Sequence, residues 1–343
     1  MTTSSPVTSD APGDTPTSDG APDAQHGSQN GLLRLEELPD PITADPGAPA
    51  VHHVRVLLDK RLRSLLLHDP GTRAGVDIED LHQMRVSVRR MRAALKAART
   101  LLDAQWADAL RAELGWLGRA LGPVRDLDVM IARLRGEITE LPAAERAAGD
   151  RLVAHLEEER GAARIAMIAA LDDERYATLL RRLEAVVRDP LPEPPEGLAR
   201  PELIDLVRAE ARKLDKAVRR AGEDPPDMTL HDLRIRTKRL RYTGELVEPA
   251  MRDEKGRRTK AAKRIRKTLA ASAELQEVLG DHQDACVAEH RIRRLLDDLG
   301  DAPDAHVVFV GGRLVERERA RAEELRRQWW AAWQTLNERA GSL

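Results

Sequence analysis

The stretch LHQMRVSVRRMRAALK, residues 81–96, contains two parallel stripes of side chains. The larger apolar residues recur at the three- and four-residue spacing of one helix face: Leu81, Met84, Val88, Met91 and Leu95. A cationic set follows the same spacing one residue later: His82, Arg85, Arg89, Arg92 and Lys96. One residue turns a helix by about 100°, so the cationic stripe lies directly beside the apolar one. No acidic residue occurs between positions 81 and 102. A helix that buries the apolar stripe therefore holds a row of positive charge along the edge of its packing surface.

The same pattern returns at residues 230–242, LHDLRIRTKRLRY, after an offset of 149 positions (230 − 81). Its apolar residues match the first copy, and its cationic stripe is His231, Arg234, Lys238 and Arg241. A second motif is also duplicated, as LGPVRDLDV at residues 121–129 and LGDHQDACV at 279–287, with an offset of 158 (279 − 121). About nine extra residues therefore separate the motifs in the second copy. This duplication predicts two helical repeats derived from one unit.

Composition shifts divide the chain into four parts. Residues 1–48, rich in Ser, Thr, Pro, Gly and Asp, are expected to form a disordered tail. Residues 49–188 are the first predicted repeat, 189–200 a proline-rich linker, and 201–343 the second repeat. Each repeat is predicted to contain about six helices, with breaks at Asp69-Pro70-Gly71, at Gly122-Pro123 and near Asp281. The fold class is therefore all-α, and no stretch is predicted as a β-strand.

Composition also limits the function classes. The chain has 343 residues, of which 33% are charged and only 2% aromatic, and its net charge is −2. With Cys286 as the one cysteine, an intramolecular disulfide is impossible and a cysteine-based zinc site is excluded. No secretory leader or membrane span is expected, because no long apolar run is present. These features favour a cytoplasmic protein.

The paired motifs resemble the CHAD domain, the conserved histidine α-helical domain, over about residues 50–340. The resemblance implies two pseudo-symmetric helical bundles around a basic central groove or channel. It also implies binding of inorganic polyphosphate, without catalysis and without a cofactor. The family's motif positions fall in this chain on His82, Arg85, Arg89, Arg90, Arg92, Arg125, His231, Arg234, Lys238, Arg239, Arg241 and His282. Lys96 extends the first stripe. The copies differ where Val124 stands opposite His282 and Gln283 opposite Arg125.

Rows of Arg and Lys suit polyphosphate, a flexible polyanion, because guanidinium groups form bidentate bonds to phosphate oxygens. Four alternatives stay open at this stage. Neighbouring carboxylates could neutralise individual arginines, and the histidines could serve in packing or converge as metal ligands through His82, His231 and His282. A nucleic acid is another polyanionic partner, although so few aromatic residues offer little base stacking. A phosphohydrolase or kinase lacks support, since no phosphate-binding loop is present.

A further basic run occupies residues 255–267. Four of its residues share one predicted helix side: Lys260, Lys263, Arg264 and Lys267. This run is either a solvated face or an extension of the groove. The oligomeric state, the chain-length preference and an association with polyphosphate granules are left open by the sequence.

Overall fold

A computed structural model describes residues 32–195 and 202–343. The described residues are all-α, as predicted, and contain no β-strand. Their helices are α1 (Ala50–Ala74), α2 (Ile78–Ala97), α3 (Ala104–Thr139), α4 (Ala143–Asp172), α5 (Glu174–Arg188), α6 (Leu203–Ala221), α7 (Asp227–Val247), α8 (Lys260–Asp297) and α9 (Ala305–Ala340), with 3₁₀ turns at Leu35–Glu37 and Pro249–Met251. None of these helices has an apolar stretch long enough to cross a membrane.

Several predicted helix breaks are wrong. Helix α1 continues through Pro70 and ends at Gly75, whose φ of 70° lies in the left-handed region that favours glycine. Helix α3 contains Pro123, and α8 passes through Asp281 without interruption. The prediction was about six helices in each repeat, whereas the described residues contain five α-helices in the first half and four in the second. A proline inside a helix costs about 3 kcal/mol, and burial of flanking residues such as Leu121 and Val124 offsets that cost.

Residues 33–48, assigned from composition to the disordered tail, pack on α1. Leu38 is buried, and the backbone N–H of Ile42 donates to the buried carboxylate of Asp59 at 2.9 Å. Residues 1–31 lie outside the described residues, as do residues 196–201 of the proline-rich linker. The first part of that linker is extended and lies against the first half, where the carbonyl of Pro192 accepts a bond from the N–H of Asp103.

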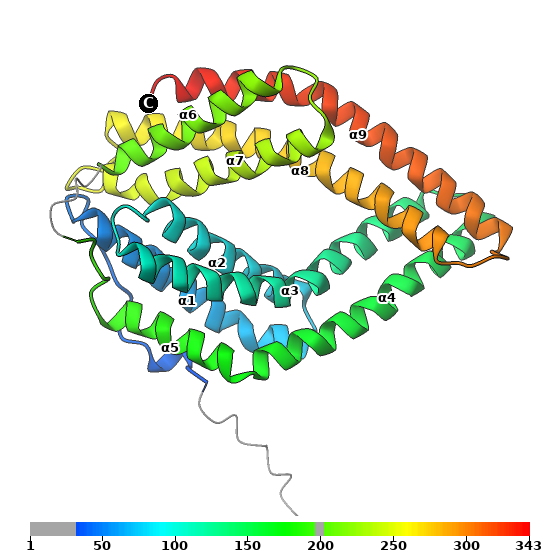
Figure 1. Ribbon diagram of the computed structural model, residues 1–343, viewed down its shortest axis with the longest axis horizontal. Helices are drawn as coiled ribbons and strands as arrows, with labels where there is room; N and C mark the ends of the chain where they lie inside the picture. The colour runs from blue at the N-terminus through cyan, green and yellow to red at the C-terminus, as the bar shows by residue number, and fades with distance from the viewer. Residues whose placement is uncertain (1–31, 196–201) are drawn as a thin grey trace, which may run out of the picture. The chain divides into compact units, whose positions relative to one another are not determined.

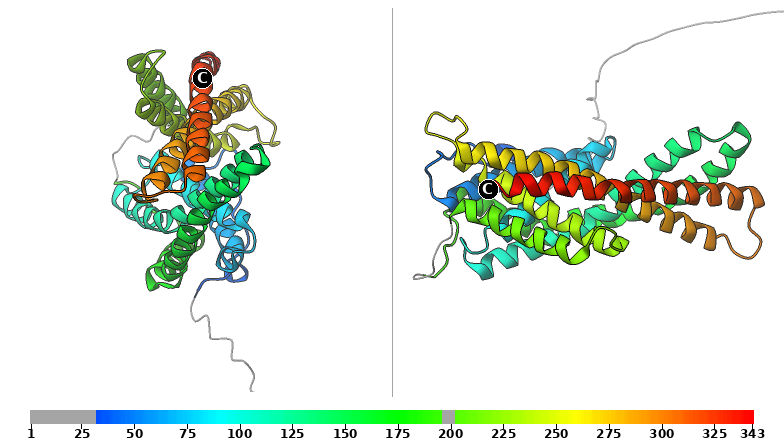
Figure 2. Two further views of the ribbon diagram at one scale, coloured as in Figure 1. Left: turned by 90° about the vertical axis from the view of Figure 1, so that its right-hand side faces the viewer. Right: turned by 90° about the horizontal axis from the view of Figure 1, so that it is seen from above.

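Helices α1–α5 make up the first half and α6–α9 the second, and the halves meet in two places (Figures 1 and 2). At one junction, parts of α3 and α4 pack with α8 and α9 around a shared apolar core. Leu134, Leu156, Ile292 and Leu314 are all fully buried there. The guanidinium of Arg133 on α3 forms a bidentate ion pair with Glu318 on α9, whose side chain is 2% exposed.

The other junction places α2 beside α7, the two helices that carry the duplicated signature. The predicted apolar stripes are buried on both helices: Leu81, Met84, Val88, Met91 and Leu95 on α2, and Leu230, Leu233 and Leu240 on α7. Because the cationic stripes adjoin these buried stripes, packing of the two helices fixes where the charges lie.

Candidate functional site: a basic seam between α2 and α7

We call the predicted cationic side chains of the two signature helices, α2 and α7, the basic seam. Its members are His82, Arg85, Arg89, Arg92 and Lys96 on α2, and His231, Arg234, Lys238, Arg239 and Arg241 on α7. Lys238 shows that charges from both helices share one space. The pKa of its ammonium is lowered to about 8, first by burial and then by the positive charges of Arg234 and Arg89. The two cationic rows therefore meet and repel each other across the seam.

Several buried polar nitrogens in the seam have no hydrogen-bond partner among the described residues. The Nε atoms of Arg89 and Arg234 and the Nδ1 atom of His231 are buried without a hydrogen-bond partner. A buried donor without an acceptor costs about 1–3 kcal/mol, more when it carries charge. Six of the predicted site residues form no ion pair with any carboxylate of the described residues: Arg89, Arg92, Lys96, Arg125, Lys238 and Arg239. The seam therefore contains more positive charges than carboxylates that form ion pairs with them.

Two arginines at the outer edge of the seam are paired in matching ways. Arg85 contacts Asp126 at 3.0 Å and donates to the carbonyl of Gly122, while Arg234 lies 3.6 Å from Asp284. The two aspartates occupy equivalent positions of the duplicated motif (126 + 158 = 284). The carboxylate of Asp126 is exposed and that of Asp284 is about half exposed, so water reaches both ion pairs.

The ends of the seam differ in charge. At one end Glu245 on α7 accepts from Arg241 at 3.1 Å and lies 3.5 Å from Arg90 on α2. At the other end Lys96, which is the equivalent of Glu245 in the first copy (96 + 149 = 245), faces Arg239. The pKa of Lys96 is lowered by burial and then by Arg239 and Arg111. Glu245 therefore forms ion pairs at one end, whereas at the other end Glu210 only partly opposes the effect of the cations on Lys96.

Sequence reasoning missed several cations that join this second end. Arg111 and Arg119 of α3 lie close enough to lower the pKa of Arg92, after the larger effect of burial. Lys213 of α6 acts in the same direction on Lys96. These residues belong to no duplicated motif, so helical periodicity within one stretch could not associate them with α2.

His82 lies among the cations of the first half. Burial lowers the pKa of its ring, and the charges of Arg125, Arg89 and Arg85 lower it further, against an opposing effect from Glu79. The neutral form of the His82 imidazole is therefore favoured in the free protein. Arg125 belongs to α3 and extends the cationic surface from α2 towards that helix.

Two hollows in the described part of the protein are lined by basic residues. One lies between α1 and α7 and is lined in part by Arg61, Arg90, Tyr242 and Glu245. The Nε atom of Arg61 is buried there without a partner. The other hollow lies at the start of α8, and its lining includes Lys263 and Lys267 of the basic run but no residue of α2. The remaining two candidates of that run, Lys260 and Arg264, are exposed outside its lining.

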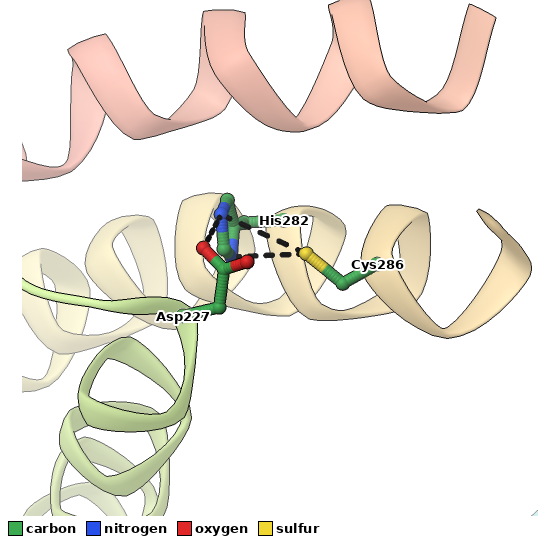
Figure 3. A group of neighbouring side chains, drawn as sticks. All are labelled: Asp227, His282 and Cys286. Carbon is green, nitrogen blue, oxygen red and sulfur yellow. Dashed lines mark hydrogen bonds and ion pairs between the residues drawn. The ribbon is translucent and has the colours of Figure 1, made fainter. Parts of the chain in front are cut away.

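His282 lies apart from the set to which the motif comparison assigned it. Its side chain is 2% exposed and contacts Asp227 and Cys286, with the ring Nε2 3.4 Å from the Oδ1 of Asp227 (Figure 3). Burial lowers the pKa of His282 and raises that of the Cys286 thiol to about 11. The group of potential metal ligands that converges among the described residues contains His282 but neither His82 nor His231.

Comparison with known proteins places these features in context. Residues 56–293 match the family model of the CHAD domain. The uncharacterized proteins MT2285 and Rv2226 of Mycobacterium tuberculosis (strains CDC 1551 / Oshkosh and ATCC 25618 / H37Rv) are each 30% identical over 330 residues. The aligned region covers 93% of this chain but only 59% of either relative, so the chain spans less than two thirds of their length.

Two solved structures share the fold. The CHAD domain from the plant Ricinus communis superposes with a TM-score of 0.66 at 27% identity, covering 92% of this chain and 98% of that one. PptA from Streptomyces chartreusis gives a TM-score of 0.64 at 21% identity and covers 85% of this chain and 100% of that one. At 21% identity, the similarity to PptA supports a shared fold and nothing further.

Proposed function

This chain belongs to the CHAD domain family, some of whose members bind polyphosphate, and from this premise we propose that it binds inorganic polyphosphate along the basic seam without catalysing its conversion. The cationic rows of α2 and α7 would form the wall of the binding groove. The partner is then a free polyanion, encountered in the cytoplasm or on a polyphosphate granule.

The observation that carries this proposal is the excess of unpaired positive charge where two halves of the chain meet. Arg89 and Lys238 approach each other from different helices, and each lacks a carboxylate partner among the described residues. Like charges at this spacing repel, and burial strengthens the repulsion. A bound polyanion would relieve it and would supply acceptors to the buried Nε atoms of Arg89 and Arg234.

Polyphosphate suits the arrangement chemically. It repeats about one negative charge per phosphate and presents oxygen acceptors on every side. Arginines offer two parallel N–H donors to such oxygens, and a lysine adds a compact charge. The row extends from His82 to Lys96 on α2, a rise of 14 residue steps or about 21 Å of helix. A chain of several phosphates could therefore contact the seam at once, which favours a polymer over a single phosphate.

Neutralisation of the seam tests the proposal. The variant Arg89→Gln/Lys238→Gln removes two charges that form no ion pair in the described residues. The matched control Arg135→Gln/Arg327→Gln removes two charges from largely exposed residues of α3 and α9. We expect the first variant to lose at least about tenfold in polyphosphate affinity by calorimetry, and the control to bind nearly as the parent does.

Equal affinity in the two double variants would exclude the seam as the site. The same titration with single-stranded and duplex DNA separates the polyanions. Displacement of polyphosphate by DNA at an equal phosphate concentration would favour the nucleic-acid alternative. Helix content measured by circular dichroism confirms that each variant is folded.

A further inference from the structure

A compact group of three different side chains lies outside the basic seam, where the start of α7 meets α8 (Figure 3). Asp227 is the first residue of α7, whereas His282 and Cys286 are one helical turn apart on α8. The ligand atoms of the three residues all lie within 4.8 Å of one another. This convergence is independent of the argument for polyphosphate.

We propose that Asp227, His282 and Cys286 bind one Zn²⁺ ion. The exclusion of a cysteine-based zinc site, drawn from the single cysteine, therefore holds only for sites with two or more thiolate ligands, since this site would need one. Imidazole nitrogen, thiolate sulfur and carboxylate oxygen are the three ligand types that zinc accepts in proteins. Residues at positions i and i+4 of a helix present their side chains on one face, so His282 and Cys286 can reach the same ion. A carboxylate from a second helix completes a three-residue set, which leaves one tetrahedral position for water or another ligand.

The distances agree with this assignment. Zinc–nitrogen and zinc–sulfur bonds of about 2.1 and 2.3 Å in a tetrahedron place neighbouring ligand atoms about 3.3–3.8 Å apart. The Nε2 of His282 lies 3.4 Å from the Oδ1 of Asp227, and the Sγ of Cys286 lies 3.9 Å from each ring nitrogen. The Nε2–Oδ1 distance lies within this range, and the sulfur lies slightly beyond it and equally far from both ring nitrogens, so the imidazole must rotate for Nε2 and the sulfur to bind the same ion.

The neighbouring contacts allow Asp227 to exchange partners. Arg326 of α9 forms an ion pair with Asp227, but its guanidinium also contacts Asp224 at 3.1 Å and the carbonyl of Pro225. Arg326 can thus retain two acceptors when the carboxylate of Asp227 turns to the metal. As the zinc–sulfur bond forms, the Cys286 thiol releases its proton to solvent. The resulting thiolate and the carboxylate balance the two positive charges of the ion.

The site belongs to the second half alone. In the first copy of the duplicated motif, Val124 and Asp128 occupy the positions of His282 and Cys286 (124 + 158 = 282; 128 + 158 = 286). Asp128 forms an ion pair with Arg160 instead. A zinc ion would fasten the beginning of α7, the second signature helix, to α8, and would do so in one half of the duplicated chain.

Cobalt substitution provides a direct test, because Cys286 is the one cysteine of the chain. The full-length protein, freed of metal with a chelator, is titrated with Co²⁺ and then with Zn²⁺. We expect a thiolate-to-cobalt charge-transfer band that saturates at one equivalent and disappears on addition of Zn²⁺. The variant Cys286→Ser should lack the band, and Asp227→Asn and His282→Gln should each weaken Co²⁺ binding at least about tenfold.

The matched control is His290→Gln, which removes an exposed histidine from the same helix and should leave the titration unchanged. The absence of a charge-transfer band in the folded parent protein would overturn the proposal. So would a band that persists at full strength in both Asp227→Asn and His282→Gln, because Cys286 would then bind cobalt without the other two ligands. Neither outcome bears on polyphosphate binding, which is measured separately.

Discussion

Lys238 gives the proposed polyphosphate site a specific dependence on pH. Its pKa of about 8 in the free protein results first from burial and then from the charges of Arg234 and Arg89. A bound polyanion would stabilise the charged ammonium and return the pKa towards its ordinary value of about 10.4. Below about pH 8 Lys238 is already protonated in the free protein, so binding requires no proton uptake. Above that pH, binding must first add a proton, and the affinity falls.

The size of the effect follows from these two values. At about pH 9 roughly one molecule in ten of the free protein carries a protonated Lys238, which costs about 1.4 kcal/mol of binding free energy. Affinity for long-chain polyphosphate should therefore fall about tenfold between about pH 7 and about pH 9. Internal phosphates of the polymer are strong acids and keep their charge across this range.

Calorimetry at constant ionic strength measures this loss. Because the pKa of Lys96 is also lowered, the comparison is made between Lys96→Arg and Lys96→Arg/Lys238→Arg. An arginine stays protonated throughout, so the double variant should lose the pH dependence. The reasoning is refuted if Lys96→Arg binds equally well at both pH values, or if the double variant shows the same decline.

Three other expectations concern charge and stability. Glu245→Lys gives both ends of the seam the same charge, and it should raise polyphosphate affinity several-fold and steepen its salt dependence, as calorimetry at two salt concentrations would show. Lys238→Met should raise the free energy of unfolding in urea by about 1–2 kcal/mol at pH 7, and by progressively less as the pH rises from about 8 to about 10.4. In that range Lys238 of the parent protein is deprotonated in the folded state but still protonated in the unfolded state, so the parent gains stability with pH. Arg133→Met leaves the buried carboxylate of Glu318 unpaired and should cost about 3–5 kcal/mol in urea unfolding, most of which Arg133→Met/Glu318→Leu should restore.

Helix interiors were the most predictable part of the fold, and helix boundaries the least. The spacing of Leu81, Met84 and Val88 identified a buried face correctly, because periodicity records which side of a helix avoids water. Gly122-Pro123 misled the prediction of a break, because local propensity carries no information about packing. In α3 the carbonyl of Gly122 accepts a bond from Arg85, and Val124 is buried directly after the proline.

The site was predictable as a set of residue types but not as a set of contacts. Arg89 and Lys238 were both expected to bind an anion, and they do approach each other across the seam. Arg90 was also predicted to bind the anion, yet it is the next residue after Arg89 on α2 and forms an ion pair with Glu245. His282 was grouped with them by motif position and instead contacts Asp227 and Cys286.

The amino-acid sequence by itself determined that this chain is helical, that two of its motifs occur twice, and that one helix in each half carries a basic stripe beside an apolar one. These are properties of neighbours three and four positions apart, which any helix brings together. Only the tertiary structure decided which charges of α2 face those of α7 and which carboxylate meets His282 and Cys286. The residues in those contacts lie tens to hundreds of positions apart, and their separations depend on how the buried faces of whole helices pack.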